Sequence, residues 1–232
     1  MCKLFLFGAP AIECNSHSHS IQRRKAKALL AYLAVTQQSQ SREVLAALLW
    51  PEYDRRSGLA DLSRILSILR KTLGANFFLT DRESVALHED ADLWVDVLHF
   101  RKQLESCQKT TGLDDDSLHK LASAVELYQA DFLAGFTLPD CPDFDEWQLL
   151  QTEALRRDLG WALEKLVHAY VVRNDLAQAI VYARRWVGLD PLHEPAQRRL
   201  IALYAGNGQR AEAHRQYRVC ERLLAEELGV EP

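Results

Sequence analysis

The chain has 232 residues, of which 48% are hydrophobic and 26% charged, and its formal net charge is −4. This composition is typical of a globular protein and excludes a disordered or low-complexity chain. No apolar run approaches the roughly 20 residues that cross a bilayer, and residues 1–8 are too short and too soon interrupted for a signal peptide. We therefore expect no membrane partner.

The five cysteines are odd in number and widely scattered, without a Cys-x-x-Cys pair: Cys2, Cys14, Cys107, Cys141 and Cys220. Disulfide frameworks and thiolate zinc sites both need paired, closely spaced cysteines. The pattern indicates neither, and it favours a reducing, cytoplasmic location.

Charge is distributed unevenly along the chain. Residues 21–73 contain ten basic and four acidic side chains, a net charge of +6, whereas residues 98–232 contain 16 basic and 21 acidic side chains. A local positive excess can attract a polyanion such as DNA even in an acidic protein. A solvated helical surface explains an excess of this size equally well.

The first elements are short strands and two helices. Residues 3–13 are rich in Leu, Phe and Ile and are interrupted by Gly8-Ala9-Pro10, which predicts two short strands and a turn. Apolar residues at helical spacing predict a helix over about 22–35. Ser41 then suits the N-cap of a second helix that ends near Trp50-Pro51.

The third predicted helix, about 55–73, is strongly amphipathic. Its leucines recur at steps of three and four residues, at positions 59, 62, 66, 69 and 73, and Gly74 suits a helix end. The opposite side displays Ser57, Ala60, Arg64, Ser67 and Lys71. Such a helix is expected to bury its leucines and to present its polar side to solvent or to a ligand.

A hairpin and a short strand complete the first unit. The β-prone runs 77–80 and 85–88 enclose four polar residues, which predicts a hairpin, and residues 92–96 close the unit. We therefore expect an α+β domain over residues 1–96, with short strands, three helices and a terminal hairpin.

Everything beyond residue 96 is predicted to be helical, over about 97–107, 117–134, 146–173, 175–188, 192–206 and 209–228, with linkers at 112–116 and 137–145. A shift of 34 residues superimposes Leu166 on Leu200, Tyr170 on Tyr204 and Ala179 on Ala213. Thirty-four residues is the tetratricopeptide period. The sequence therefore predicts a mostly α protein whose residues 97–232 form an all-α, tetratricopeptide-like domain.

No catalytic pattern is present. The chain lacks a Gly-rich phosphate loop, a Gly-x-Ser-x-Gly motif and a His-Glu-x-x-His motif. We expect neither an enzyme nor a catalytic, cofactor or metal site.

The order of these elements resembles the OmpR-type winged helix. More specifically, the chain resembles the antibiotic-regulatory-protein activators, which join such a winged helix to a bacterial transcriptional activation domain. The matching segments are Leu4–Gly8, Gln22–Leu33, Ser41–Leu45, Leu48–Trp50, Leu66–Gly74, Asn207–Ala213 and Glu227–Pro232. Each segment is weak alone, and their order and spacing carry the resemblance.

The resemblance makes the third helix the recognition helix for the DNA major groove. Arg64 is then placed to meet guanine O6 and N7, and Ser67, with Ser63 beside it, to meet base edges. The expected phosphate contacts are Arg42, Arg55, Arg56, Arg70 and Lys71. Arg82, in the hairpin, is the candidate for a minor-groove contact by the wing.

The resemblance also names partners, namely promoter DNA, RNA polymerase and a second copy of the chain, because one short helix reads few base pairs. Two departures concern Ala60-Asp61, where relatives often carry Asn and Ala, and Glu83-Ser84, where they carry a Gly-Tyr pair. They keep open an alternative, a protein-interaction scaffold with degenerate DNA binding. The sequence equally leaves open whether the chain is the N-terminal part of a larger signalling ATPase.

Overall fold

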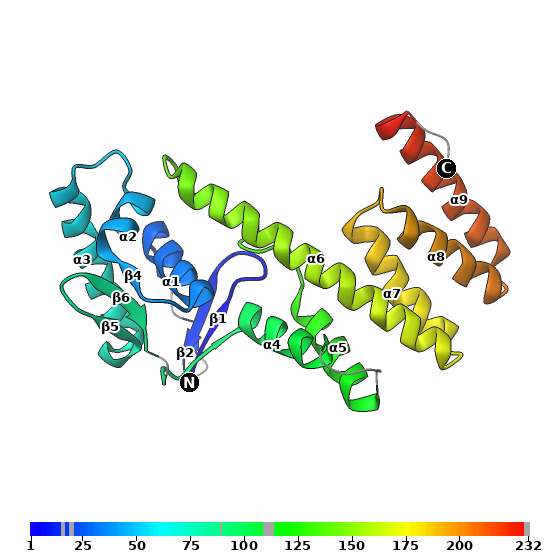
Figure 1. Ribbon diagram of the computed structural model, residues 1–232, viewed down its shortest axis with the longest axis horizontal. Helices are drawn as coiled ribbons and strands as arrows, with labels where there is room; N and C mark the ends of the chain where they lie inside the picture. The colour runs from blue at the N-terminus through cyan, green and yellow to red at the C-terminus, as the bar shows by residue number, and fades with distance from the viewer. Residues whose placement is uncertain (15–16, 19–20, 89, 109–113, 230–232) are drawn as a thin grey trace. The chain divides into compact units, whose positions relative to one another are not determined.

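The computed structural model describes residues 1–14, 17–18, 21–88, 90–108 and 114–229 (Figure 1). The described part is mostly helical and divides into two compact units, each with its own contacts. The first contains Met1–Lys102 and Leu127–Ala154, and the second contains Gln103–Glu126 and Leu155–Pro232. In the described part, no helix has the length and apolar character to span a membrane.

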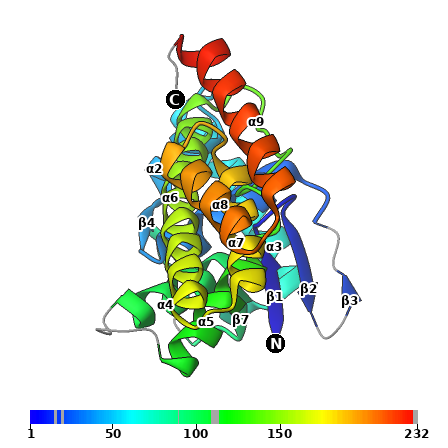
Figure 2. The same ribbon diagram turned by 90° about the vertical axis from the view of Figure 1, so that its right-hand side faces the viewer.

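A four-stranded sheet begins the first unit. Strands β1 (Cys2–Phe5), β2 (Ala11–Cys14) and β3 (His17–Ser18) are antiparallel neighbours, and Figure 2 shows them side by side. Strand β7 (Leu93–Val95) pairs with β1 in parallel, so the sheet order is β3-β2-β1-β7. The sheet therefore joins residues at both ends of the predicted winged helix.

Cys2 and Cys14 stand opposite each other in β1 and β2 and form a disulfide. The expectation that no cysteines pair is wrong for these two, because the hairpin brings together residues that the sequence separates by 12 positions. Cys107, Cys141 and Cys220 are buried and take no part in a disulfide.

Three helices and a small sheet follow. They are α1 (Arg24–Thr36), α2 (Arg42–Leu49) and α3 (Arg55–Leu73), with strand β4 (Gln40–Ser41) before α2. After a short 3-10 turn, strands β5 (Phe78–Thr80) and β6 (Ser84–Leu87) form the predicted hairpin, and β4 pairs with β6. The winged-helix order predicted from the sequence is confirmed.

Asp96 fastens the end of β1 to the start of α4 (Asp96–Gln108). Its carboxylate accepts hydrogen bonds from Leu6 N at 2.8 Å, Phe7 N at 2.9 Å and Val97 N at 2.7 Å, and the residue is 3% exposed. Burial raises the pKa of the Asp96 carboxyl, although the backbone N–H groups act to lower it. The charge-assisted hydrogen bonds satisfy backbone groups where β1 ends.

Residues 127–154 belong to the same core. Leu133 N donates to Leu6 O at 2.8 Å, Gly8 N donates to Asp131 O at 3.0 Å, and Phe7 forms an isolated bridge with Phe132. The helix predicted over 117–134 is therefore wrong beyond Leu127, where α5 (Asp115–Leu127) ends, since the backbone beyond it pairs with the chain after β1.

Helix α6 (Pro142–Val172) contributes its first turns to the first unit. The Trp147 ring lies 4.9 Å from Tyr32 of α1 and 5.5 Å from Phe132, between ring centroids. The helix begins at Pro142, within the stretch predicted as a linker at 137–145. The other predicted linker, 112–116, lies partly outside the described residues.

The second unit contains α5, the rest of α6, α7 (Leu176–Leu189), α8 (Glu194–Gly206) and α9 (Arg210–Leu228). Helix α8 packs against both α7 and α9. The 34-residue repeat recurs in the backbone, because Asn174 and Gly208 occupy matching turns with φ of +59° and +75°. The matching Ala179 and Ala213 are both buried, which permits close helix packing.

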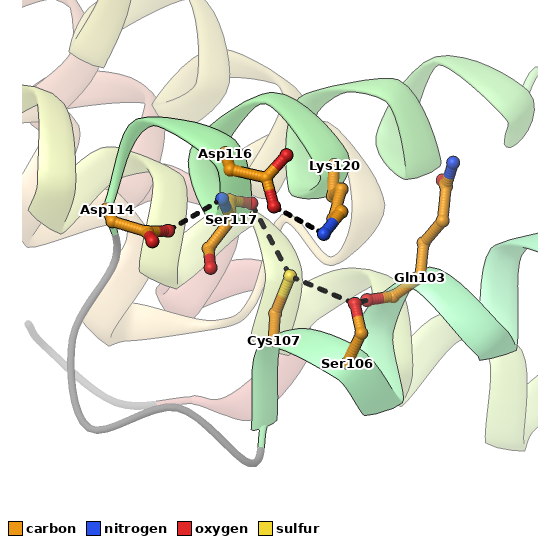
Figure 3. A network of polar contacts seen from close by, with 7 residues as sticks. All are labelled: Gln103, Ser106, Cys107, Asp114, Asp116, Ser117 and Lys120. Atoms are coloured by element: carbon orange, nitrogen blue, oxygen red, sulfur yellow. Dashed lines mark hydrogen bonds and ion pairs between the residues drawn. The ribbon is translucent and has the colours of Figure 1, made fainter.

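The end of α4 and the start of α5 share a polar network (Figure 3). Cys107 Sγ donates to Ser117 O at 3.4 Å, and the Asp114 carboxylate accepts from Ser117 N at 2.8 Å. Hydrogen bonds from the side chain and the backbone of Ser117 lower the pKa of Asp114. The network caps α5 and holds it against α4.

Candidate DNA-binding surface

Side-chain caps fix the starts of α2 and α3. Ser41 Oγ accepts from Glu43 N at 3.2 Å, as the sequence predicts, and the Asp54 carboxylate accepts from Arg56 N at 2.9 Å and Ser57 N at 3.1 Å. The hydrogen bonds from Ser57 and Arg56 lower the pKa of Asp54. Both caps satisfy N–H groups that a helix start leaves without partners.

Helix α3 packs closely against α2. Gly58 is buried where the helices meet, and a Cβ at this position would lie 3.4 Å from Ala46 Cβ. The buried stripe of α3 comprises Leu62, Ile65, Leu66, Leu69 and Leu73. This packing fixes which side of α3 faces outward.

The outward side carries the predicted base-reading residues. Ser67 and Lys71 are exposed, and neither side chain has a hydrogen bond or ion pair with a described residue. The Arg64 side chain is 71% exposed, and its Nη1 lies 2.5 Å from Asp61 Oδ1. Arg64 is therefore accessible, with its charge partly balanced one turn earlier on the same helix.

Arg42, Ser63 and the wing come together beside this face. Arg42 Nη2 donates to Ser63 Oγ at 2.8 Å, and Arg42 N donates to Glu83 O at 2.8 Å. Ser63 Oγ in turn donates to Leu59 O. Residues of α2, α3 and the hairpin turn thus form one continuous polar surface.

The two arginines at the start of α3 differ. Arg55 forms an ion pair with Glu43 of α2, which raises the pKa of Arg55. Arg56 is exposed and has no side-chain partner within the described ranges. Arg56 is the freer of the two for a phosphate.

Arg70 makes a hydrogen bond to the wing. It is half-buried, and its Nη2 donates to Thr80 Oγ1 on β5. It therefore ties the end of α3 to the wing.

The wing turn is organised by Asp81, which accepts from Glu83 N at 2.7 Å and Ser84 N at 2.6 Å. These hydrogen bonds lower the pKa of Asp81, and the charge of Arg42 lowers it further. The turn exposes Arg82. Asp81 can thus position Arg82 without the Gly-Tyr pair that the family resemblance leads us to expect at the wing.

The sequence did not reveal a pocket beside α3. It has a volume of about 270 Å³ and is lined by Arg23, Arg24, Lys25, Trp50, Asp61 and Ile65. Lys25 Nζ lies 5.1 Å from the centroid of the Trp50 ring and 5.9 Å from the centroid of the Tyr53 ring. Both distances are within the range of cation–π contacts. The acidic Asp61 therefore lines a pocket together with three basic residues at the start of α1, and it pairs with Arg64 of α3.

Comparison with known proteins identifies relatives that match most of the chain. It is 26% identical over 213 residues to the regulatory protein AfsR of Streptomyces coelicolor and 29% identical over 196 residues to AfsR of Streptomyces griseus. These matches cover 89% and 79% of this chain, but only 20% and 18% of the relatives. The chain thus spans about a fifth of the length of those proteins.

A solved structure shares the fold from end to end. The structure of Mycobacterium tuberculosis EmbR in complex with a low-affinity phosphopeptide matches with a TM-score of 0.77 and 19% identity, over 100% of this chain and 62% of that one. The winged helix followed by a helical domain is therefore the EmbR-like fold. The resemblance to antibiotic-regulatory-protein activators is confirmed by these relatives. Because residues 95–232 also match the bacterial transcriptional activator domain, the chain belongs to that family of transcription regulators.

Proposed function

We propose that this regulator binds double-stranded promoter DNA through α3 and activates transcription. Residues 1–96 supply the DNA contacts, and residues 97–232 form the tetratricopeptide-like activating domain. The proposed contacts comprise the full predicted set: Arg42, Arg55, Arg56, Ser63, Arg64, Ser67, Arg70, Lys71 and Arg82. Such a protein acts where the bacterial chromosome lies, in the cytoplasm.

The division of α3 carries this proposal. Leu62, Leu66, Leu69 and Leu73 are buried and Leu59 is half-buried. The side chains of Arg64, Ser67 and Lys71 are exposed along about two turns of one side. A major groove about 12 Å wide accepts one helix, whose outer side meets the base edges. Arg56 and Arg82 are exposed nearby and suit phosphates.

Activation requires a second contact beyond DNA. The matched activator domain supports recruitment of RNA polymerase by the helical part. One recognition helix reads only a few base pairs, so we propose that two copies bind neighbouring half-sites. Analytical ultracentrifugation with and without a two-site duplex measures this stoichiometry.

The test is selection of bound sites from random DNA, followed by titration of the full chain against the selected duplex at several salt concentrations. Arg64→Ala should weaken binding to this duplex by about 1–3 kcal/mol and relax one base preference. Lys71→Ala should weaken binding evenly across sequences and reduce the salt slope by about one. Lys102→Ala, which removes an exposed cation of α4, is the matched control.

Two results would contradict the proposal. Wild-type binding by both α3 variants would show that this face does not meet DNA. Absence of any sequence preference in the selection would favour the scaffold alternative, for which Asp61 beside Arg64 is the supporting observation.

A further inference from the structure

The second unit contains a pocket that DNA recognition does not use. It has a volume of about 420 Å³ and lies among α6, α7 and α8. The lining residues are Glu164, Lys165, Val167, His168, Trp186, Pro195 and Arg199. Helices α6 and α8 occupy equivalent places in the 34-residue repeat, so the pocket lies between corresponding faces of the two repeats.

Trp186 offers an unused donor at this pocket. Its side chain is buried, with the residue 8% exposed, and its indole N–H has no hydrogen-bond partner within the described part of the chain. Gly160 of α6 lies beside the ring, since a Cβ there would be in ordinary contact with Trp186 Nε1, at 3.8 Å. An indole N–H can only donate, so its complement is an acceptor such as a carboxylate or a carbonyl oxygen.

The cations of the pocket are also unpaired. Some other basic residues of this unit form ion pairs, namely Arg173 with Asp115, Arg185 with Glu126, and Arg215 with Glu212. Lys165 and Arg199 have no ion pair or hydrogen bond with any described residue. Glu164 is the single acidic residue of the lining, so the pocket carries a positive excess.

We propose that this pocket binds an acidic peptide segment of a partner protein. Carboxylates of the segment pair with Lys165 and Arg199, and a backbone or side-chain oxygen accepts from the Trp186 indole. An apolar side chain of the segment packs on the edge of the Trp186 ring that lines the pocket. A groove between helices with an apolar floor and a few donors is a common form of peptide site.

A peptide fits the surroundings better than a nucleic acid does. Residues 98–232 contain 16 basic and 21 acidic side chains, so a long polyanion would meet repulsion outside the pocket. A duplex is also too wide to enter a pocket of about 420 Å³. The apolar part of the lining favours a segment with an apolar residue beside its acids over a free small acid.

The experiment titrates the full chain with a short, capped, fluorescein-labelled peptide of repeating Leu-Glu-Ser, read by anisotropy. Lys165→Glu and Arg199→Glu should each weaken binding about tenfold, since each replaces attraction by repulsion. Arg198→Glu is the matched control, because Arg198 is the exposed neighbour on α8 that does not line the pocket. It should bind within about twofold of the wild type. Lys165→Gln and Arg199→Gln replace the reversals if either fails to fold.

A second readout locates the site. The chain has five tryptophans, and the indole resonance that disappears in Trp186→Phe should shift when the peptide is added to ¹⁵N-labelled wild type. Equal binding of a Leu-Lys-Ser peptide, equal loss in Arg198→Glu, or an unmoved Trp186 resonance would overturn the proposal. The proposal would also be overturned if duplex DNA displaced the peptide and Lys165→Glu or Arg199→Glu abolished that displacement. Equal affinity of the chain for free glutamate and for the peptide would overturn it as well. None of these outcomes depends on whether α3 binds promoter DNA.

Discussion

At the scale of single residues, Asp96 shows how one carboxylate can hold distant segments together. It is buried and accepts backbone hydrogen bonds from Leu6, Phe7 and Val97. An asparagine would present an NH₂ group to donors and leave one of them without an acceptor. Asp96→Asn should therefore lower the free energy of unfolding by about 2 kcal/mol or more, as measured in urea. Glu13→Gln, at an exposed position of the same sheet, should change it little.

The loss of unfolding free energy in Asp96→Asn should depend on pH in a defined direction. Burial raises the pKa of Asp96 in the folded state. The stability that comes from its protonated form is therefore fully present below the pKa of the unfolded chain and is lost as pH rises through the pKa of the folded protein. The difference in unfolding free energy between wild type and Asp96→Asn should therefore narrow as pH rises. A gap that widens with pH would show that the carboxylate is more stable buried than in the unfolded chain.

For Asp54 we expect the opposite pH dependence of stability. Hydrogen bonds from Ser57 and Arg56 lower its pKa, so its contribution is present above the unfolded pKa and is lost as pH falls through the folded value. Asp54→Asn keeps a capping oxygen but removes the charge. The difference in melting temperature between wild type and this variant should shrink on acidification. A constant difference would mean that the charge adds nothing to the cap.

At the scale of elements, the spacing of α2 and α3 depends on Gly58. A Cβ there already reaches 3.4 Å from Ala46 Cβ, so the branched side chain of Gly58→Val must push the helices apart. We expect a loss of about 1–3 kcal/mol in urea unfolding, together with weaker DNA binding as Arg42 and Ser63 separate. Gly58→Ala should cost much less, because alanine favours a helix. Equal losses for the two variants would contradict this account.

The sequence predicts elements well where the determinants are local. Helix α3 runs from Arg55 to Leu73 as predicted, because its leucine stripe, its N-terminal cap and Gly74 all lie within or next to it. The segment after Leu127 was predicted as helix, and its true path depends on backbone pairing with Leu6 and Gly8. Pairing over such a separation leaves no local pattern.

The contacts of the candidate DNA-binding surface also divide into those that local sequence predicts and those that it does not. Periodicity predicts that Arg64, Ser67 and Lys71 share the exposed side of α3, and the structure agrees. Periodicity does not predict the hydrogen bond from Arg70 to Thr80 or the cation–π contact of Lys25 with Trp50, because each contact joins two different elements. The pocket around Trp186 likewise depends on three helices.

At the scale of the whole molecule, the first unit is discontinuous in sequence, since it needs Leu127–Ala154. Trp147 contacts Tyr32 of α1, Phe132 and Phe144. Trp147→Ala should destabilise this unit by about 3 kcal/mol and speed hydrogen exchange in α1, although the two positions are far apart in the chain. Leu149→Ala, at a 60% exposed position of the same helix, is the control. Unchanged exchange in α1 would show that Trp147 does not support this core.

The parallel pairing of β1 with β7, and the docking of Leu127–Ala154 after it, bear on how the protein is made. A nascent chain is synthesised from its N-terminus, and a domain closes only when all its parts have left the ribosome. Strand β7 ends at Val95 and the docked segment at Ala154, so the core around β1 is completed only after about two thirds of the polypeptide has been translated. During that interval the apolar residues of β1 are exposed and available to chaperones. Slowing or pausing synthesis before Ala154 prolongs this exposure and should therefore lower the yield of native regulator.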